Sequence, residues 1–174
     1  GPNFNNLITN EGINIFILKL NNNGDFVWVK QMGGIGNDVG KSLTIDNQGF
    51  IYSTGHFRDV VDFNPSSVVV NNLTANGASN FTDFFIQKID TSGIFYWVKG
   101  IGGANHDGSR SITHDNQGNI YVTGTFAHTV DFNPGVGTAI LIGLPLNPNV
   151  FVLKMTNAGN FVWARDFGHT GYDY

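Results

Sequence analysis

Apolar and polar residues alternate with a period of two in three well-separated stretches of the chain. The segment FVWVK at 26–30 places its two aromatic residues and its lysine on one face and its two valines on the other. The same alternation returns around Trp97 and around Trp163. A period of two is that of β-strands, whose successive side chains point to opposite faces. Each stretch therefore predicts a strand, and no helical pattern competes.

Short turn motifs lie between the predicted strands. NNNG, DTSG and TNAG each place an Asn, Asp or Thr three residues before a glycine, and DNQG occurs twice with the same arrangement. This is typical of tight hairpin loops whose glycine takes a positive φ. The predicted strands are 41–46, 50–57, 84–90, 94–101, 110–115, 119–126, 150–156 and 160–167.

The whole pattern repeats along the chain. Trp97 follows Trp28 by 69 residues and Trp163 follows Trp97 by 66. KSLTIDNQGFIYSTGHF at 41–57 matches RSITHDNQGNIYVTGTF at 110–126, and DFNP occurs in both repeats. Repeats of this length build arrays in which each module buries its apolar face against the next.

We predict an all-β fold made of repeated four-stranded antiparallel blades of a β-propeller. The expected modules are a partial blade with the third and fourth strands at 1–37, a complete blade at 38–106, and a complete blade with the start of the next junction at 107–174.

About two and a half blades cannot close a propeller, which needs about four to eight. The chain is therefore expected to be a fragment of a larger molecule, or to associate with copies of itself. The partial blade would leave an unpaired strand edge and an apolar face, with Phe16, Leu18, Phe26 and Trp28 as its candidates. We expect further blades of the parent protein or another chain to cover that face, because exposing it to water is costly.

Composition argues against several classes of partner and chemistry. Only 13% of the residues are charged, the net charge is −4, and no basic run occurs, so neither nucleic acid nor an anionic membrane is an expected partner. The absence of cysteine excludes disulfides, zinc–thiolate sites and thiol nucleophiles. No apolar run approaches the roughly 20 residues of a membrane span.

Several spaced motifs also resemble a known family. They are a GG-x3-D-x-G-x-S string, D-x-x-G-N-I-Y-V-T-G, DFNP, FVLK and GNFVWA, in that order, and together they cover nearly the whole chain. They resemble the bacterial β-propeller repeat called SBBP, and the DFNP-containing kind resembles repeats of type IX secreted cell-surface proteins. The resemblance implies an extracellular or cell-surface protein and supplies no catalytic residues.

Two apparent ligand motifs fail on their spacing. GGIGND at 33–38 fits the opening of calcium-binding nonapeptide repeats, but its next copy, GGANHD, lies 69 residues away instead of nine. GIGNDVGKS resembles a phosphate loop, but Ile35 occupies the position of a required glycine. Both segments are better explained as turns between blades.

The three tryptophans could form a sugar-stacking ladder or pack between blades. Their strict recurrence favours packing, so Trp28, Trp97 and Trp163 are expected in equivalent, largely buried positions. Basic residues two positions later should extend along the same face with their charged ends in water, and these are Lys30, Lys99 and Arg165.

Other recurring residues are expected to shape the repeat. Paired aspartates are better explained as turn-tying residues than as acid–base catalysts. The recurring positions are Asp38 with Asp107, Asp46 with Asp115, and Gly55 with Gly124. The five histidines show no metal-ligand spacing; they are His56, His106, His114, His128 and His169.

The segments after DFNP, 66–82 and 135–149, differ between repeats and are candidate contact surfaces. Oxygen donors beside them make calcium a candidate ligand, and no other cofactor is expected. The candidate calcium residues are Asp62, Asn64, Asp131 and Asn133.

The function that we expect is a non-enzymatic extracellular repeat scaffold or binding module, part of a large secreted or cell-surface adhesin that contacts glycans or proteins through its loops. One alternative is a fragment of a propeller enzyme, a polysaccharide hydrolase or lyase whose active site lies on other blades. A second alternative is secretion-system cargo whose repeats have only structural value.

Overall fold

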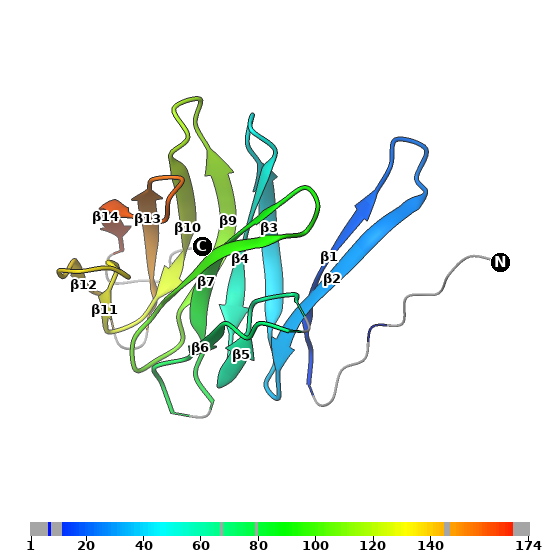
Figure 1. Ribbon diagram of the computed structural model, residues 1–174. Helices are drawn as coiled ribbons and strands as arrows, with labels where there is room; N and C mark the ends of the chain where they lie inside the picture. The colour runs from blue at the N-terminus through cyan, green and yellow to red at the C-terminus, as the bar shows by residue number, and fades with distance from the viewer. Residues whose placement is uncertain (1–6, 8–11, 67, 79, 145–146, 169–174) are drawn as a thin grey trace.

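The computed structural model describes residues 7, 12–66, 68–78, 80–144 and 147–168. This part of the chain consists of strands and turns without any helix, and hence without a helix that could cross a membrane. The strands form sheets that stand side by side along the molecule (Figure 1). The prediction of an all-β, blade-like fold is confirmed, while the segments 1–6, 8–11 and 169–174 of the predicted end modules lie outside the described residues.

Two sheets are complete four-stranded antiparallel blades in which each strand pairs with the next strand of the same blade. The first complete blade consists of β3 (Val39–Ile45), β4 (Phe50–Phe57), β7 (Asp83–Asp90) and β8 (Phe95–Ile101). The second complete blade consists of β9 (Gly108–His114), β10 (Ile120–Phe126), β13 (Asn149–Met155) and β14 (Phe161–Phe167). All eight strands fall within about two residues of the predicted ranges.

The partial blade contains β1 (Ile15–Leu20) and β2 (Phe26–Gly34). Its sheet is extended by a short hairpin from the next module, formed by β5 (Val60–Asp62) and β6 (Asn72–Thr74). β5 pairs with the end of β2 through Gly33 opposite Asp62 and Gly34 opposite Val61. The sequence did not predict this hairpin.

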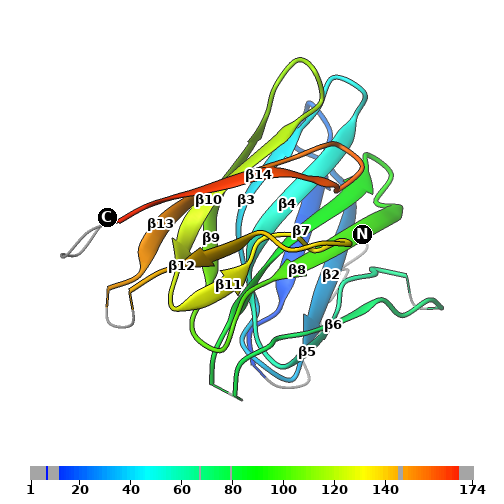
Figure 2. The same ribbon diagram turned by 90° about the vertical axis from the view of Figure 1, so that its left-hand side faces the viewer.

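An equivalent hairpin follows the first complete blade. It is formed by β11 (Thr129–Asp131) and β12 (Ile140–Ile142). Both hairpins lie close to a glycine pair at the end of the preceding blade's last strand. A Cβ atom added to Gly34 would lie 2.1 Å from the Val60 carbonyl oxygen, and one added to Gly103 would lie 2.5 Å from the Thr129 carbonyl oxygen. Each complete blade therefore places a DFNP-containing hairpin against the blade before it. Figure 2 shows the β11–β12 hairpin beside the first complete blade.

Two apolar cores lie between the blades, and β7 contributes to both. Phe85 and Ile89 pack toward the partial blade, whereas Phe84 and Ile86 pack toward the second complete blade. All four side chains are buried. Because β7 is covered on both faces, three apolar residues follow one another at 84–86 instead of alternating with polar ones.

Candidate functional site

The DFNP hairpins are shaped by their aspartates. The Oδ1 atom of Asp62 accepts hydrogen bonds from the amides of Asn64 (3.0 Å) and Asn71 (2.8 Å). In the next repeat, Asp131 Oδ1 accepts from the amides of Asn133 (2.9 Å) and Ala139 (2.8 Å). Each carboxylate therefore joins the two sides of its loop.

The asparagines of DFNP form a second turn directly after the first. Asn64 Oδ1 accepts from the Ser66 amide at 3.0 Å, and Asn133 Oδ1 accepts from the Gly135 amide at 2.9 Å. The four calcium candidates thus serve backbone amides. The described residues contain no group of three or more His, Asp or Glu side chains suited to a metal ion, and calcium stays an untested candidate ligand of these four residues.

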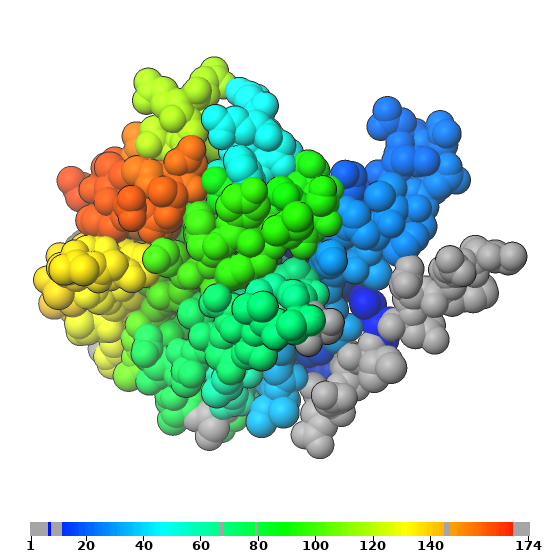
Figure 3. Space-filling view, viewed as in Figure 1, coloured from blue at the N-terminus to red at the C-terminus, as the bar shows by residue number. Residues whose placement is uncertain are grey.

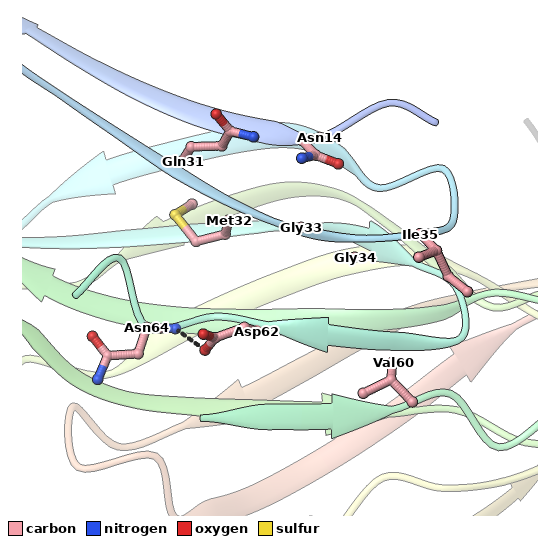
Figure 4. Close-up of a pocket in the computed structure, with 9 residues that line it drawn as sticks. All are labelled: Asn14, Gln31, Met32, Gly33, Gly34, Ile35, Val60, Asp62 and Asn64. Carbon is pink, nitrogen blue, oxygen red and sulfur yellow. Dashed lines mark hydrogen bonds between the residues drawn. The ribbon is translucent and has the colours of Figure 1, made fainter. Parts of the chain in front are cut away.

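A groove of about 510 Å³ lies where the β5–β6 hairpin meets the partial blade (Figure 4). Polar side chains line it from both sides, with Asn14 and Gln31 on the partial blade and Asp62 and Asn64 on the hairpin. The Oδ1 atom of Asn14 is buried without a hydrogen-bond partner. Its three amide side chains and one carboxylate offer donors and acceptors suited to a hydroxyl-rich ligand, and Met32, Ile35 and Val60 add apolar surface.

The tryptophans of the first two repeats contact the turn between the third and fourth strands of the following blade. Trp28 Nε1 donates to the Thr91 carbonyl at 3.1 Å. The ring of Trp97 packs on the equivalent turn, where a Cβ on Gly159 would lie 3.3 Å away. All three tryptophans are partly buried, and Trp28 and Trp97 pack against the cores between blades. They lie on the outer strands, where the blade faces open toward solvent.

Sequence reasoning missed a lysine that fastens each blade to the next. Lys19 Nζ donates to the Thr91 carbonyl at 2.7 Å, and one repeat later Lys88 Nζ donates to the Asn157 carbonyl at 3.2 Å. Figure 1 shows the β7–β8 turn leaning toward the β1–β2 hairpin, where the first of these contacts is made. The signal was present in the sequence as the final lysine of FILK, FIQK and FVLK.

Asp46 and Asp115 are turn residues. Asp46 Oδ1 accepts from the Gln48 and Phe50 amides, both at 2.9 Å, and its Oδ2 accepts from the Tyr52 hydroxyl at 3.1 Å. Asp115 repeats this arrangement. The hydrogen bond from the Asn119 side chain, with further donors, lowers the pKa of Asp115 to about 2. A carboxylate held ionised in this way is suited to accepting hydrogen bonds and poorly suited to acid catalysis.

Three buried carboxyl groups lie at the blade junctions. Asp107 accepts from the amides of Gly103 (2.7 Å) and Ala127 (3.0 Å), and Asp38 makes the equivalent bonds one repeat earlier. Burial raises the pKa of Asp107 to about 7 and that of Asp83 to about 6, and it also raises that of Asp38. Their hydrogen bonds hold the GGIGND and GGANHD segments as turns between blades.

Gly55 and Gly124 allow a β-bulge in the first strand of each complete blade. Pairing between β3 and β4 passes from Gly40 opposite Gly55 directly to Ser42, which leaves Lys41 as the extra residue. A Cβ on Gly55 would lie 1.9 Å from a backbone oxygen of β3, and one on Gly124 would lie 2.1 Å from a backbone oxygen of β9. No side chain fits at either position, because the bulged strand approaches too closely.

The comparisons with known proteins agree with this architecture. Residues 27–56 and 97–125 match the family profile described as a beta-propeller repeat, SBBP. Each matched segment runs from the last strand of one blade to the second strand of the next, so the sequence repeat is offset from the structural blade.

The chain is also similar to an uncharacterized WD repeat-containing protein of Acanthamoeba polyphaga mimivirus, at 28% identity over 160 residues. That alignment covers 79% of this chain but only 11% of the viral protein. The fold and both comparisons support a repeat scaffold or binding module.

Proposed function

We propose that the chain is part of a non-enzymatic, extracellular repeat scaffold that extends by adding blades at its open faces and contacts glycans or proteins through its variable loops. The low charge and the amide-rich lining of the groove beside Asp62 suit hydrogen bonding to such partners. The DFNP motif, as in the surface proteins that the sequence resembles, supports a cell-surface adhesin as the parent protein.

The observation that carries the scaffold role is the burial of equivalent residues in successive blades. Phe16 in the partial blade is 60% exposed, whereas the equivalent Phe85 and Phe151 are both 0% exposed. The next alternating position shows the same contrast, with Leu18 exposed and its equivalent Leu153 buried. In both complete blades, a preceding blade supplies this cover.

The open face consists of Phe16, Leu18, Leu20 and Phe26, all of them exposed. Trp28, which the sequence placed on the same face, instead packs against the core on the opposite side. Burying a large apolar side chain is worth about 1.5–3 kcal/mol, so a partner for this face would be bound with a substantial gain. Figure 3 shows the β1–β2 hairpin projecting at the end of the molecule.

In a preparation of this chain alone, the available partner is a second copy. Sedimentation at increasing concentration should show association, and the variant F16Q/L18Q should remain monomeric. Val136→Gln is the matched control because Val136 is fully exposed on a loop outside this face. A chain that stays monomeric at every concentration would contradict the role of the face.

Contact with glycans or proteins requires a separate test. The chain is applied to a glycan array and to a pull-down with surface proteins, together with variants in which 66–70 or 135–138, the parts of the two segments that precede β6 and β12, are replaced by Gly/Ser residues of equal number. Binding that is lost in a loop variant with unchanged folding would support the proposal. Cleavage of a polysaccharide, abolished by one substitution, would overturn the non-enzymatic role.

A further inference from the structure

A second cavity, of about 210 Å³, lies between the two complete blades, near the start of their first strands. Lys41 and His56 line it from the first complete blade, Arg110 lines it from the second, and His106 lies on the turn between them. These four residues are spread over 70 positions of the sequence, and only the packing of β3 and β4 against β9 brings them together. We name it the junction cleft.

The two strong cations of the junction cleft occupy the same structural position in successive blades. Lys41 and Arg110 are the extra residues of the two β-bulges, which exist because Gly55 and Gly124 lack side chains. A bulge redirects the side chain of its extra residue, and bulges are common beside functional sites. Neither cationic side chain makes a hydrogen bond or ion pair within the described part of the chain.

The cations are close enough to influence one another. The pKa of His56 is lowered, first by burial and then by the positive charges of Lys41, Arg110, Arg58 and His106. An anion bound among them would offset this repulsion and favour the charged form of His56.

One acidic group faces the junction cleft. Asp107 is 1% exposed, its carboxyl group is bound by two backbone amides, and burial together with the nearby Asp83 raises its pKa to about 7. Asp107 therefore compensates only part of the positive charge of Lys41 and Arg110 at neutral pH, and it compensates a smaller part as the pH falls.

We propose that the junction cleft binds an oxyanion, the carboxylate or sulfate group of a small ligand. Guanidinium and ammonium groups are the side chains that bind such groups most strongly. A volume below the roughly 300–1,000 Å³ of typical ligand pockets fits one anionic group with a small attached moiety, such as a sugar acid. The site goes beyond the proposed scaffold role and does not depend on it.

Sodium sulfate and sodium glucuronate are titrated separately into the full chain at constant ionic strength, with glucose as the neutral control. Binding is followed by NMR, which also reports the pKa of His56. We expect saturable shifts of the cleft residues and a rise in the His56 pKa with at least one anion. Saturation by sulfate alone would assign the site to small inorganic oxyanions, and tighter binding of glucuronate would assign it to sugar acids.

Lys41→Gln and Arg110→Gln should each weaken binding about three- to fivefold, and the double variant about tenfold or more. Lys154→Gln removes a cation from another part of the molecule and should leave binding unchanged. Affinity should also be higher at pH 6 than at pH 8, because Asp107 loses its negative charge as the pH falls through its pKa of about 7. No saturable binding of either anion, or equal binding by K41Q, R110Q and the parent chain, would overturn the proposal.

Discussion

The lysine that joins successive blades gives a prediction with an internal control. Lys88 is 7% exposed, its Nζ lies 3.8 Å from the centroid of the Phe50 ring, and it donates to the Asn157 carbonyl of the next blade. Lys154 occupies the same position one repeat later, where the described part of the chain has no following blade. Replacing each by methionine keeps the apolar stem and removes only the charged end.

The expected cost follows from the interactions that the charge makes. A hydrogen bond from a charged group contributes about 1.5–3 kcal/mol, and a largely desolvated cation–π contact up to about 2 kcal/mol. Burial and desolvation lower the pKa of Lys88, which shows that its charge loses hydration in the fold and offsets part of this gain. We therefore expect Lys88→Met to lower the free energy of unfolding by about 2–3 kcal/mol, and Lys154→Met by less than about 1 kcal/mol.

Urea unfolding monitored by tryptophan fluorescence measures both variants. Trp97 packs on the turn that accepts the Lys88 hydrogen bond, so its emission should respond to loss of this contact. If the free energies of unfolding of the two variants differ by less than about 0.5 kcal/mol, the view that the lysine stabilises the junction between blades is refuted, because a difference of that size is within the usual uncertainty.

Three further predictions concern the repeat itself. Burial raises the pKa of Asp83 to about 6, above its unfolded value of 3.8, so the stability it contributes is present below pH 3.8 and is lost as the pH rises through 6. Asp83→Asn, which introduces the residue found at this position in the other repeats, should make the protein more stable than the parent at pH 8 but not at pH 4 in thermal melts. Gly124→Ala should destabilise the fold by about 3 kcal/mol or more in urea, because its Cβ would lie 2.1 Å from the Gly108 carbonyl oxygen, and near-neutral behaviour would contradict the bulge. Millimolar calcium should leave the melting temperature unchanged, whereas a rise that is lost in D62N and D131N would show that these carboxylates bind the ion.

The long strands were predictable because two independent signals marked them. The alternation of apolar and polar residues predicted which side chains share a face of each strand, and the glycines predicted where the turns lie. Gly24, Gly93 and Gly159 have the positive φ that their turn motifs require. The repeated aspartates were equally readable, because an Asx residue two to four positions before the amides that it binds is a local feature. Asp46 is an example, with its bonds to the Gln48 and Phe50 amides.

The short hairpins and the junction cleft were not predictable by the same reasoning. β5 and β6 have three residues each, too few for a period to be recognised, and β5 pairs with a strand of another module. His56 and His106 are 50 residues apart in sequence and meet only because two blades pack together. Long-range packing of this kind has no local sequence signal.

The junctions explain why the sequence repeat and the structural blade are offset. A complete blade places its DFNP hairpin against the preceding blade, as β5 does on β2, while the preceding blade sends a lysine forward to the turn of the next, as Lys19 does to Thr91. Each junction is therefore held from both sides by residues that belong to different modules. Cutting the chain at a blade boundary would remove part of the neighbouring blade's sheet or one of its hydrogen bonds. The smallest unit that keeps all its contacts is thus a blade with both of its neighbours. The two segments that match the family profile run from β2 to β4 and from β8 to β10. They therefore cross the blade boundaries and contain the residues that form the junctions.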